Sequence, residues 1–212
     1  MSRWGNRVEV IGSQELRAIH PLGKLPAALI DGQPLFESAA IVTAIADLVP
    51  EKGLIAKPGT WARNLHYQWV CFALTELEAY VHSTEINSMD FVIPKSQHVP
   101  QIIAQNSMLF KRGAAALDAV LRKAEYLIEE RFSATDIIVG YTVNWGQEQG
   151  LLGEFPGLLA YLECLFAREH CTLTRHRDGG VWPGAGKAGP QWRRMRAIRR
   201  TGDCPPIWKG WD

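Results

Sequence analysis

The spacing of apolar residues separates an N-terminal region of short elements from a longer helical region. In the first region two short apolar runs flank Asp31-Gly32, a dipeptide typical of the tight turn in a β-hairpin. An Ala- and Ile-rich stretch follows, with the composition of a helix. The elements predicted for this region, β–α–β–β–α in chain order, lie at residues 7–11, 13–19, 27–30, 33–36 and 39–48.

After a linker at 57–59, apolar residues recur at steps of three and four, the spacing of amphipathic helices. We expect helices there at 60–81, 101–124, 134–147 and 155–168. The first of them carries a bulky stripe that we interpret as core rather than as ligand contact: Trp61, Leu65, Trp69, Phe72, Leu77 and Tyr80. The two regions together predict an α+β fold that is mostly helical.

The segment from Phe132 to Ile137 marks the start of the third predicted helix. Ser133 and Asp136 have the spacing of a capping box, with Asp in place of Glu, and Phe132 and Ile137 have the spacing of a hydrophobic staple. We interpret Ser133 and Asp136 as folding residues, and the helix, apolar on most sides, as central. The charged residues of the preceding helix are expected on a solvated face: Lys111, Arg112, Asp118, Arg122 and Lys123.

The composition is that of an ordinary globular protein, with 212 residues of which 47% are hydrophobic and 21% charged. No apolar run approaches the roughly 18–20 residues that span a bilayer, and neither a signal peptide nor a CxxC pair is recognisable. We therefore expect a cytoplasmic protein with reduced thiols and no membrane partner. The six histidines lack metal-ligand spacing, so no metal is expected.

Residues 176–212 differ in character from the rest of the chain. They carry eight Lys or Arg against three Asp, a net charge of +5, together with seven glycines and four prolines. The absence of sustained apolar periodicity predicts that this tail is disordered. Its tryptophans interleave with arginines, a composition that suits stacking on nucleic acid, but a solvated extension is the simpler interpretation and we do not expect a nucleic-acid partner.

One segment carries a resemblance to a known family. From His20 to Ile41 the chain reads Pro-Leu-Gly-Lys-Leu-Pro, apolar strand, Asp-Gly, second strand and Glu-Ser-Ala-Ala-Ile, which resembles the glutathione-binding segment of glutathione transferases. The resemblance implies a cis peptide bond before the second proline, whose preceding residue pairs its backbone with the cysteinyl part of glutathione. It also implies that a Glu-Ser pair holds the γ-glutamyl group and that a lysine lies near the glycyl carboxylate. The implied glutathione-binding residues are Lys24, Leu25, Pro26, Glu37 and Ser38.

The resemblance extends over about Val8 to Arg175 and implies a domain organisation. An incomplete thioredoxin-like, glutathione-binding domain is expected at 1–50 and an all-helical C-terminal domain at 60–175, with the tail at 176–212 outside the family frame. Family members begin one strand and one helix earlier, at a junction that carries the Ser, Tyr or Cys that activates the thiol of glutathione. No residue here matches that group, so no catalytic residue is identified. The family's electrophile pocket corresponds to a region that includes Trp69 and Phe72.

Three functional hypotheses follow from the resemblance. The first is a homodimeric, cytosolic, bacterial-type glutathione transferase-like protein that joins glutathione, its co-substrate, to a small hydrophobic electrophile. Its catalytic competence is an open question, because the thiol-activating group is not identified. The second is a non-enzymatic binding or dimerisation module with the same fold. The third is a truncated gene product whose start was assigned too late.

Overall fold

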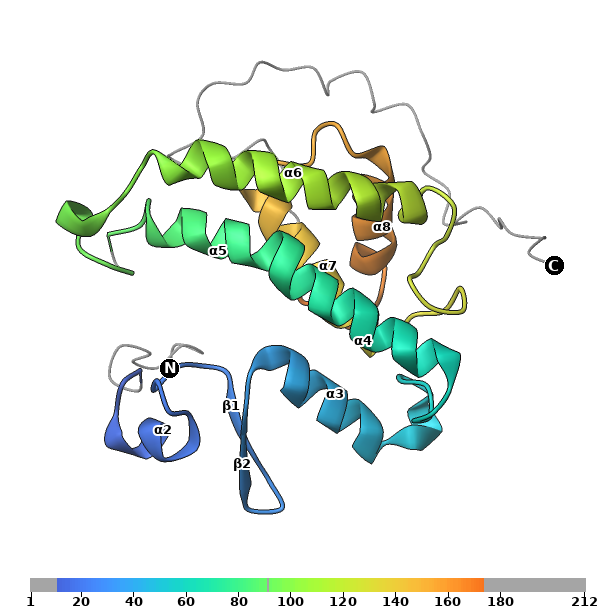
Figure 1. Ribbon diagram of the computed structural model, residues 1–212. Helices are drawn as coiled ribbons and strands as arrows, with labels where there is room; N and C mark the ends of the chain where they lie inside the picture. The colour runs from blue at the N-terminus through green and yellow to red at the C-terminus, as the bar shows by residue number, and fades with distance from the viewer. Residues whose placement is uncertain (1–10, 91, 174–212) are drawn as a thin grey trace. The chain divides into compact units, whose positions relative to one another are not determined.

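The structure is a computed structural model that describes residues 11–90 and 92–173. The chain divides into two compact units, Met1–Lys57 and Pro58–Asp212, and the division falls within the predicted linker. Figure 1 shows the short elements of the first unit and the long helices of the second. Each unit is described by itself below.

The described part of the chain is α+β and mostly helical, which confirms the predicted fold class. Its sheet has two strands, and every other regular element is helical. The predictions for residues 7–10 and for the tail at 176–212 lie outside the described residues.

The first unit is built around the predicted hairpin. It contains α2 (Gln14–Ile19), the antiparallel strands β1 (Ala27–Ile30) and β2 (Gln33–Phe36), α3 (Ser38–Leu48) and the 3-10 turn η1 (Pro50–Lys52). Ser13 caps α2, because its Oγ accepts the Leu16 N–H at 3.1 Å. Asp31 and Gly32 have positive φ angles of 49° and 76°, as a two-residue turn between twisted strands requires. The hairpin and the two helices beside it in sequence are thus confirmed.

The second unit is a bundle of helices (Figure 1). In chain order it contains α4 (Trp61–Ala73), the π-helical segment η2 (Leu74–Glu78), α5 (Ala79–Ile86), the 3-10 turn η3 (Lys95–Gln97), α6 (Ile102–Leu121), α7 (Ala134–Glu148) and α8 (Pro156–Phe166). Helices α4 and α5 are joined through η2 into one long element. Helix α6 packs on α5 and on α8, and α7 packs on α4 and on α8.

The prediction that the bulky stripe of the first long helix lies in the core is wrong for Trp61, the first residue of α4. Trp61 is 74% exposed, whereas the buried positions of α4 are Ala62, Arg63, His66, Val70 and Ala73. Helix α4 packs on α7, and the buried His66 contacts the Thr135 hydroxyl in the first turn of α7. Of the predicted stripe, Leu77 in η2 is fully buried.

Helix α7 begins with the predicted capping box, which the structure confirms. The Asp136 carboxylate accepts the backbone N–H of Ser133 at 2.8 Å and the Ser133 hydroxyl at 2.9 Å. The central position of the helix is confirmed for its buried side, but two of the residues expected in the core are exposed: Ile137 at 42% and Tyr141 at 56%. They stand at positions i and i+4 and therefore share one face of α7.

Asp118 of α6, expected on a solvated face, is 4% exposed and serves as a remote cap for α8. Its Oδ1 accepts the backbone N–H groups of Gly157 at 2.7 Å and Leu158 at 3.1 Å, in the first turn of α8. Its Oδ2 accepts the Arg122 Nε–H at 2.6 Å. Phe155, the residue before α8, offers no side-chain cap. The buried carboxylate is stable here because these N–H donors and the positive end of the helix dipole replace the interactions that it would make with water.

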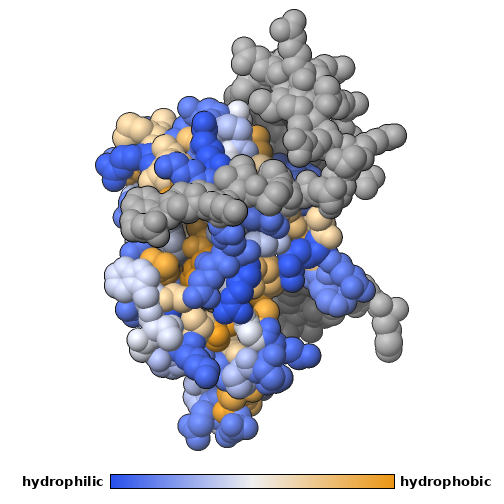
Figure 2. Space-filling view, turned by 90° about the vertical axis from the view of Figure 1, so that its right-hand side faces the viewer, coloured by the Kyte–Doolittle hydropathy of each residue, from blue (hydrophilic) through white to orange (hydrophobic). Residues whose placement is uncertain are grey.

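The surface of the described residues carries hydrophilic and hydrophobic side chains together, as the face in Figure 2 shows. Within residues 11–90 and 92–173, no helix combines the length and the apolar composition needed to cross a membrane. The cysteines in these ranges, Cys71, Cys164 and Cys171, are not joined to one another by disulfide bonds.

Candidate functional site

The open end of the hairpin brings together the two parts of the segment that sequence reasoning singled out. The ladder pairs Ala27 with Phe36 as its outermost pair. The chain therefore enters β1 from Pro26 and leaves β2 into Glu37 at the same end of the two strands. Residues 24–26 and 37–38 flank this end, and all five of them are exposed.

His20 fixes the turn that leads to this end of the hairpin. It is 4% exposed, and its Nδ1 accepts the Leu22 N–H at 3.1 Å. Its carbonyl accepts the Gly23 N–H at 2.8 Å, and its ring lies 4.9 Å, between centroids, from the ring of Phe36. His20 thus ties the turn to β2 and has a structural role.

The Leu25–Pro26 peptide bond is cis, as the sequence resemblance implies. The Leu25 side chain is 49% exposed. Within the part of the chain that the structure describes, neither the amide nor the carbonyl of Leu25 has a hydrogen-bond partner. An exposed backbone donor and acceptor beside a strand can be paired by an extended peptide ligand.

Glu37 has an unusual backbone conformation at the start of α3, with φ 71° and ψ 121°. A residue other than glycine held in a sparsely populated region stores about 1–3 kcal/mol, and such residues cluster at ligand sites. The Glu37 side chain makes no capping bond to α3, so its carboxylate does not serve the helix. Ser38 is the first residue of the helix, where backbone N–H groups lack intrahelical acceptors.

This arrangement sets a carboxylate next to a helix N-terminus. The Glu37 side chain offers a negative charge, while Ser38 and the first N–H groups of α3 favour a negative ligand group through hydrogen bonds and the helix dipole. A ligand with an ammonium and a carboxylate on one carbon matches both features. Lys24, exposed and two residues before Pro26, adds a positive charge at the same end of the hairpin.

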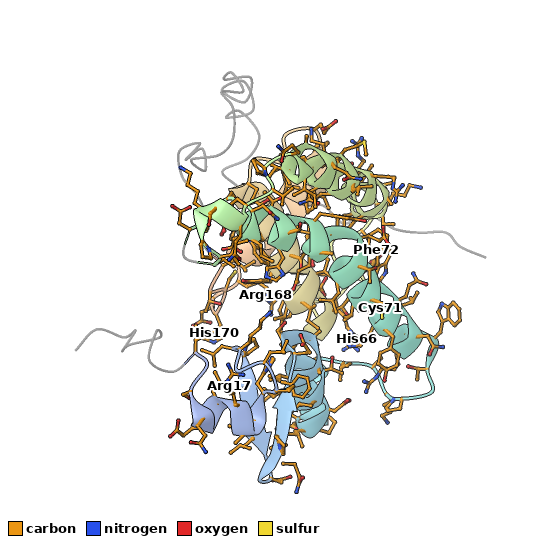
Figure 3. The ribbon with its side chains drawn as sticks, turned by 60° about the vertical axis from the view of Figure 1, so that its left-hand side comes forward. Arg17, His66, Cys71, Phe72, Arg168 and His170 are labelled. Carbon is orange, nitrogen blue, oxygen red and sulfur yellow. The ribbon has the colours of Figure 1, made fainter. Side chains whose placement is uncertain are left out.

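Trp69 and Phe72, the residues expected near an electrophile, belong to the second unit. Both lie on α4, are half-buried, and contact each other edge-on with 5.6 Å between ring centroids. Figure 3 shows Phe72 beside Cys71 on that helix. Their role in binding a ligand stays a prediction.

Sequence reasoning missed a polar cavity of about 200 Å³ in the second unit. The cavity lies between α5 and α7, and its lining residues are Glu85, Tyr141, Asn144, Trp145 and Glu148. The spacing of the α7 residues, at steps of three and four, was visible in the sequence as one helix face. The lining residue from α5, Glu85, could not be found in this way, because no local pattern indicates which helix lies against this face of α7.

Within residues 11–90 and 92–173, no three side chains from His, Cys, Asp and Glu gather as a set of metal ligands. His66, the buried histidine of α4, is joined to the Thr135 hydroxyl at 2.9 Å across to the start of α7. This contact gives the histidine a structural partner.

Comparisons with known proteins agree with the geometry. No family model matches the chain. The chain is 26% identical over 129 residues to a protein named glutathione S-transferase GstA from Escherichia coli O157:H7, an alignment that spans 60% of each protein. The chain therefore spans less than two thirds of the length of this curated relative.

Solved structures give a longer match. The chain is 28% identical to a glutathione transferase from Methylococcus capsulatus, over 72% of each chain, with a TM-score of 0.62. It is 25% identical to a sphingomonad glutathione S-transferase in complex with glutathione, over 72% of this chain and 73% of that one, with a TM-score of 0.60. Together with the hairpin, the cis Leu25–Pro26 bond and the capped core helix α7, these likenesses show that the chain belongs to the glutathione S-transferase superfamily.

Proposed function

We propose that this protein binds glutathione at the open end of the β1–β2 hairpin, as a glutathione transferase-like protein. The observation that carries the proposal is the pairing of Glu37, held at φ 71°, with the N-terminus of α3, next to the strand entry at Leu25. The solved structure of the sphingomonad relative, which contains glutathione, supports it.

Each part of glutathione has a complementary group in this proposal. The γ-glutamyl ammonium pairs with the Glu37 carboxylate, and its carboxylate accepts hydrogen bonds from Ser38 and the first turn of α3. The backbone of Leu25 pairs with the cysteinyl unit in the manner of an added strand. Lys24 pairs with the glycyl carboxylate.

The reaction that follows from this binding mode is attack of the glutathione thiolate on a small hydrophobic electrophile. A free thiol has a pKa of about 8.5, so it is mostly protonated near neutral pH and needs a donor that stabilises the thiolate. No residue of the described chain is assigned that role. Trp69 and Phe72 are the proposed contacts of the electrophile, and a homodimer is the proposed assembly.

The test is isothermal titration of the full chain with glutathione. Glu37→Gln keeps the size of the side chain and removes the charge, and we expect it to weaken binding by about tenfold, the value of one charge-assisted hydrogen bond. Glu51→Gln is the matched control, because Glu51 is an exposed acid of the same unit, in η1. Equal affinities for the wild type and Glu37→Gln, or no binding by the folded wild type, would contradict the proposal.

Turnover then separates the two functional hypotheses. If the protein is a transferase, we expect the wild type to conjugate glutathione to an aryl halide. In Glu37→Gln the rate of this conjugation should fall by the same factor as the affinity for glutathione. Glutathione binding without turnover identifies a non-enzymatic binding module.

A further inference from the structure

We propose that residues 191–200 of the chain's own C-terminal tail dock on one face of helix α7. This face, here called the α7 face, consists of Ile137, Tyr141, Trp145 and Glu148. The tail and α7 both belong to the second unit, so the inference is independent of glutathione binding by the first. It assigns a partner to a stretch of the sequence that the proposed function does not use.

The α7 face is a row of apolar side chains that solvent can reach. Its members follow one another at steps of four, four and three residues, which is the spacing of one side of a helix. Ile137 is 42% exposed and Tyr141 is 56% exposed. The half-buried Trp145 continues the row, with 6.0 Å between its ring centroid and that of Tyr141. Neighbouring exposed apolar side chains with a charged rim are typical of an interaction surface.

The rim of the α7 face is acidic. Glu148, near the end of α7, and Glu85 of α5 line one cavity together with Tyr141. Burial raises the pKa of the Tyr141 hydroxyl, and the carboxylates of Glu78, Glu148 and Glu85 raise it further, so three negative charges lie around this ring. Among the described residues, the basic side chain recorded beside the face is His82, whose ring lies 5.9 Å from the indole ring. The α7 face therefore favours a partner that is both apolar and positively charged.

Residues 191–200 have this composition. They read Gln-Trp-Arg-Arg-Met-Arg-Ala-Ile-Arg-Arg, with five arginines and no acid. Trp192, Met195 and Ile198 recur at steps of three, so a helical turn would bring them to one side, with arginines around them. Arginine also stacks on aromatic faces such as those of Tyr141 and Trp145. The segment thus complements the α7 face in apolar side chains and in charge.

The length of chain before this segment allows it to reach α7. The described chain ends at residue 173, shortly after α8, and α8 packs on α7. The 17 residues at 174–190 include five glycines, and a flexible linker of this length spans on average about 20–25 Å. Helix α7 has 15 residues and is therefore about 22 Å long. Such a tether gives the segment a local concentration in the millimolar range, which favours it over a separate partner of the same chemistry.

The test is limited trypsin digestion of the full chain, with early cleavage after the arginines at 193–200 followed by mass spectrometry. The double variant Ile137→Ser/Tyr141→Ser changes two exposed side chains, and we expect it to speed this cleavage by about tenfold. Met108→Ser is the matched control, because Met108 is 61% exposed and lies on α6, and its cleavage rate should equal that of the wild type. Equal urea unfolding midpoints show that each variant is folded.

A second pair of variants tests the charge of the rim. Glu148→Gln should also speed cleavage of the tail, whereas Glu130→Gln, an exposed acid outside the α7 face, should not change it. Raising the salt concentration should speed cleavage in the wild type, because salt screens the attraction between the arginines and the carboxylates. A synthetic peptide of residues 188–203 corrects for the effect of salt on trypsin itself.

Two results would overturn the proposal outright. One is an equal rate of tail cleavage in the wild type and in Ile137→Ser/Tyr141→Ser. The other is cleavage of the wild-type tail as fast as that of the synthetic peptide. Protection that increases with protein concentration would contradict docking within one chain and identify a second copy as the partner. Protection that requires added RNA or anionic lipid vesicles would contradict it as well and assign the tail to those partners.

Discussion

The remote cap of α8 predicts a large effect from a single charged side chain. Asp118→Ala removes the oxygen that accepts the N–H groups of Gly157 and Leu158, at 2.7 and 3.1 Å, in a place where the carboxylate is 4% exposed. A buried donor left without an acceptor costs about 1–3 kcal/mol. Because one oxygen serves both donors, the two losses are not fully additive, and we expect a loss of about 3 kcal/mol in the free energy of unfolding.

Two further variants separate capping from the ion pair. Arg122→Ala breaks the contact at 2.6 Å to Asp118, but the arginine side chain is 56% exposed, so the expected loss is about 0.5 kcal/mol. Asp118→Asn keeps an oxygen that can accept both N–H groups and loses the favourable interaction of the charge with the helix dipole, so an intermediate loss of about 1 kcal/mol is expected.

Equilibrium urea unfolding followed by far-UV circular dichroism measures all three free energies. The predicted order of destabilisation is Asp118→Ala, then Asp118→Asn, then Arg122→Ala. If Asp118→Ala and Arg122→Ala were equally destabilising, the ion pair and not the cap would be the source of the stability, and the reasoning would be refuted.

The helix contact at Gly113 and the buried Asp136 give two more predictions. A Cβ at Gly113 would lie 2.6 Å from the Glu76 carbonyl oxygen, so Gly113→Ala should lower the unfolding free energy by about 1–3 kcal/mol. Gly153→Ala is the control: a Cβ at Gly153 would have no atom within 4 Å, so this variant should change the unfolding free energy by about 0.5 kcal/mol or less. Burial raises the pKa of Asp136 against the effect of its hydrogen bonds, so the folded state holds this proton more tightly than the unfolded state. The stability of the wild type relative to Asp136→Asn should therefore fall as pH rises above about 4, and urea unfolding across this range that shows a constant or rising difference would contradict it.

The elements that sequence analysis predicted correctly are those fixed by local signals. Asp31 and Gly32 determine the turn by their own backbone preferences, and both have positive φ in the structure. Ser133 and Asp136 are three residues apart and hydrogen-bond each other directly. Such contacts form within one turn of chain, so the identity of a few neighbouring residues is enough to predict them.

The features that sequence analysis missed depend on contacts between distant residues. Asp118 and its partner Gly157 are 39 positions apart. Periodicity places Asp118 on a helix face, but it does not indicate that the start of another helix covers that face. The same limit explains the exposure of Trp61, since the pattern of bulky residues along α4 does not indicate which side of the helix packs on α7.

The candidate site and the cavity of the second unit differ in the same way. The residues around Leu25 and Glu37 lie in one short segment whose order resembles a known binding segment, so they could be named from the sequence. Glu85 and Tyr141 are far apart in the chain and come together only because α5 and α7 border one cavity. The unpartnered oxygen of Asn144 is likewise a property of packing and not of local sequence.

The most direct test of the central claim compares glutathione with the dipeptide Cys-Gly, which lacks the γ-glutamyl group. Titration of the wild type should show glutathione binding more tightly than Cys-Gly by at least about tenfold, because the Glu37 carboxylate and the start of α3 interact with the missing group. In Glu37→Gln this preference should shrink while the affinity for Cys-Gly is unchanged. Equal binding of the two peptides by the wild type would contradict the account.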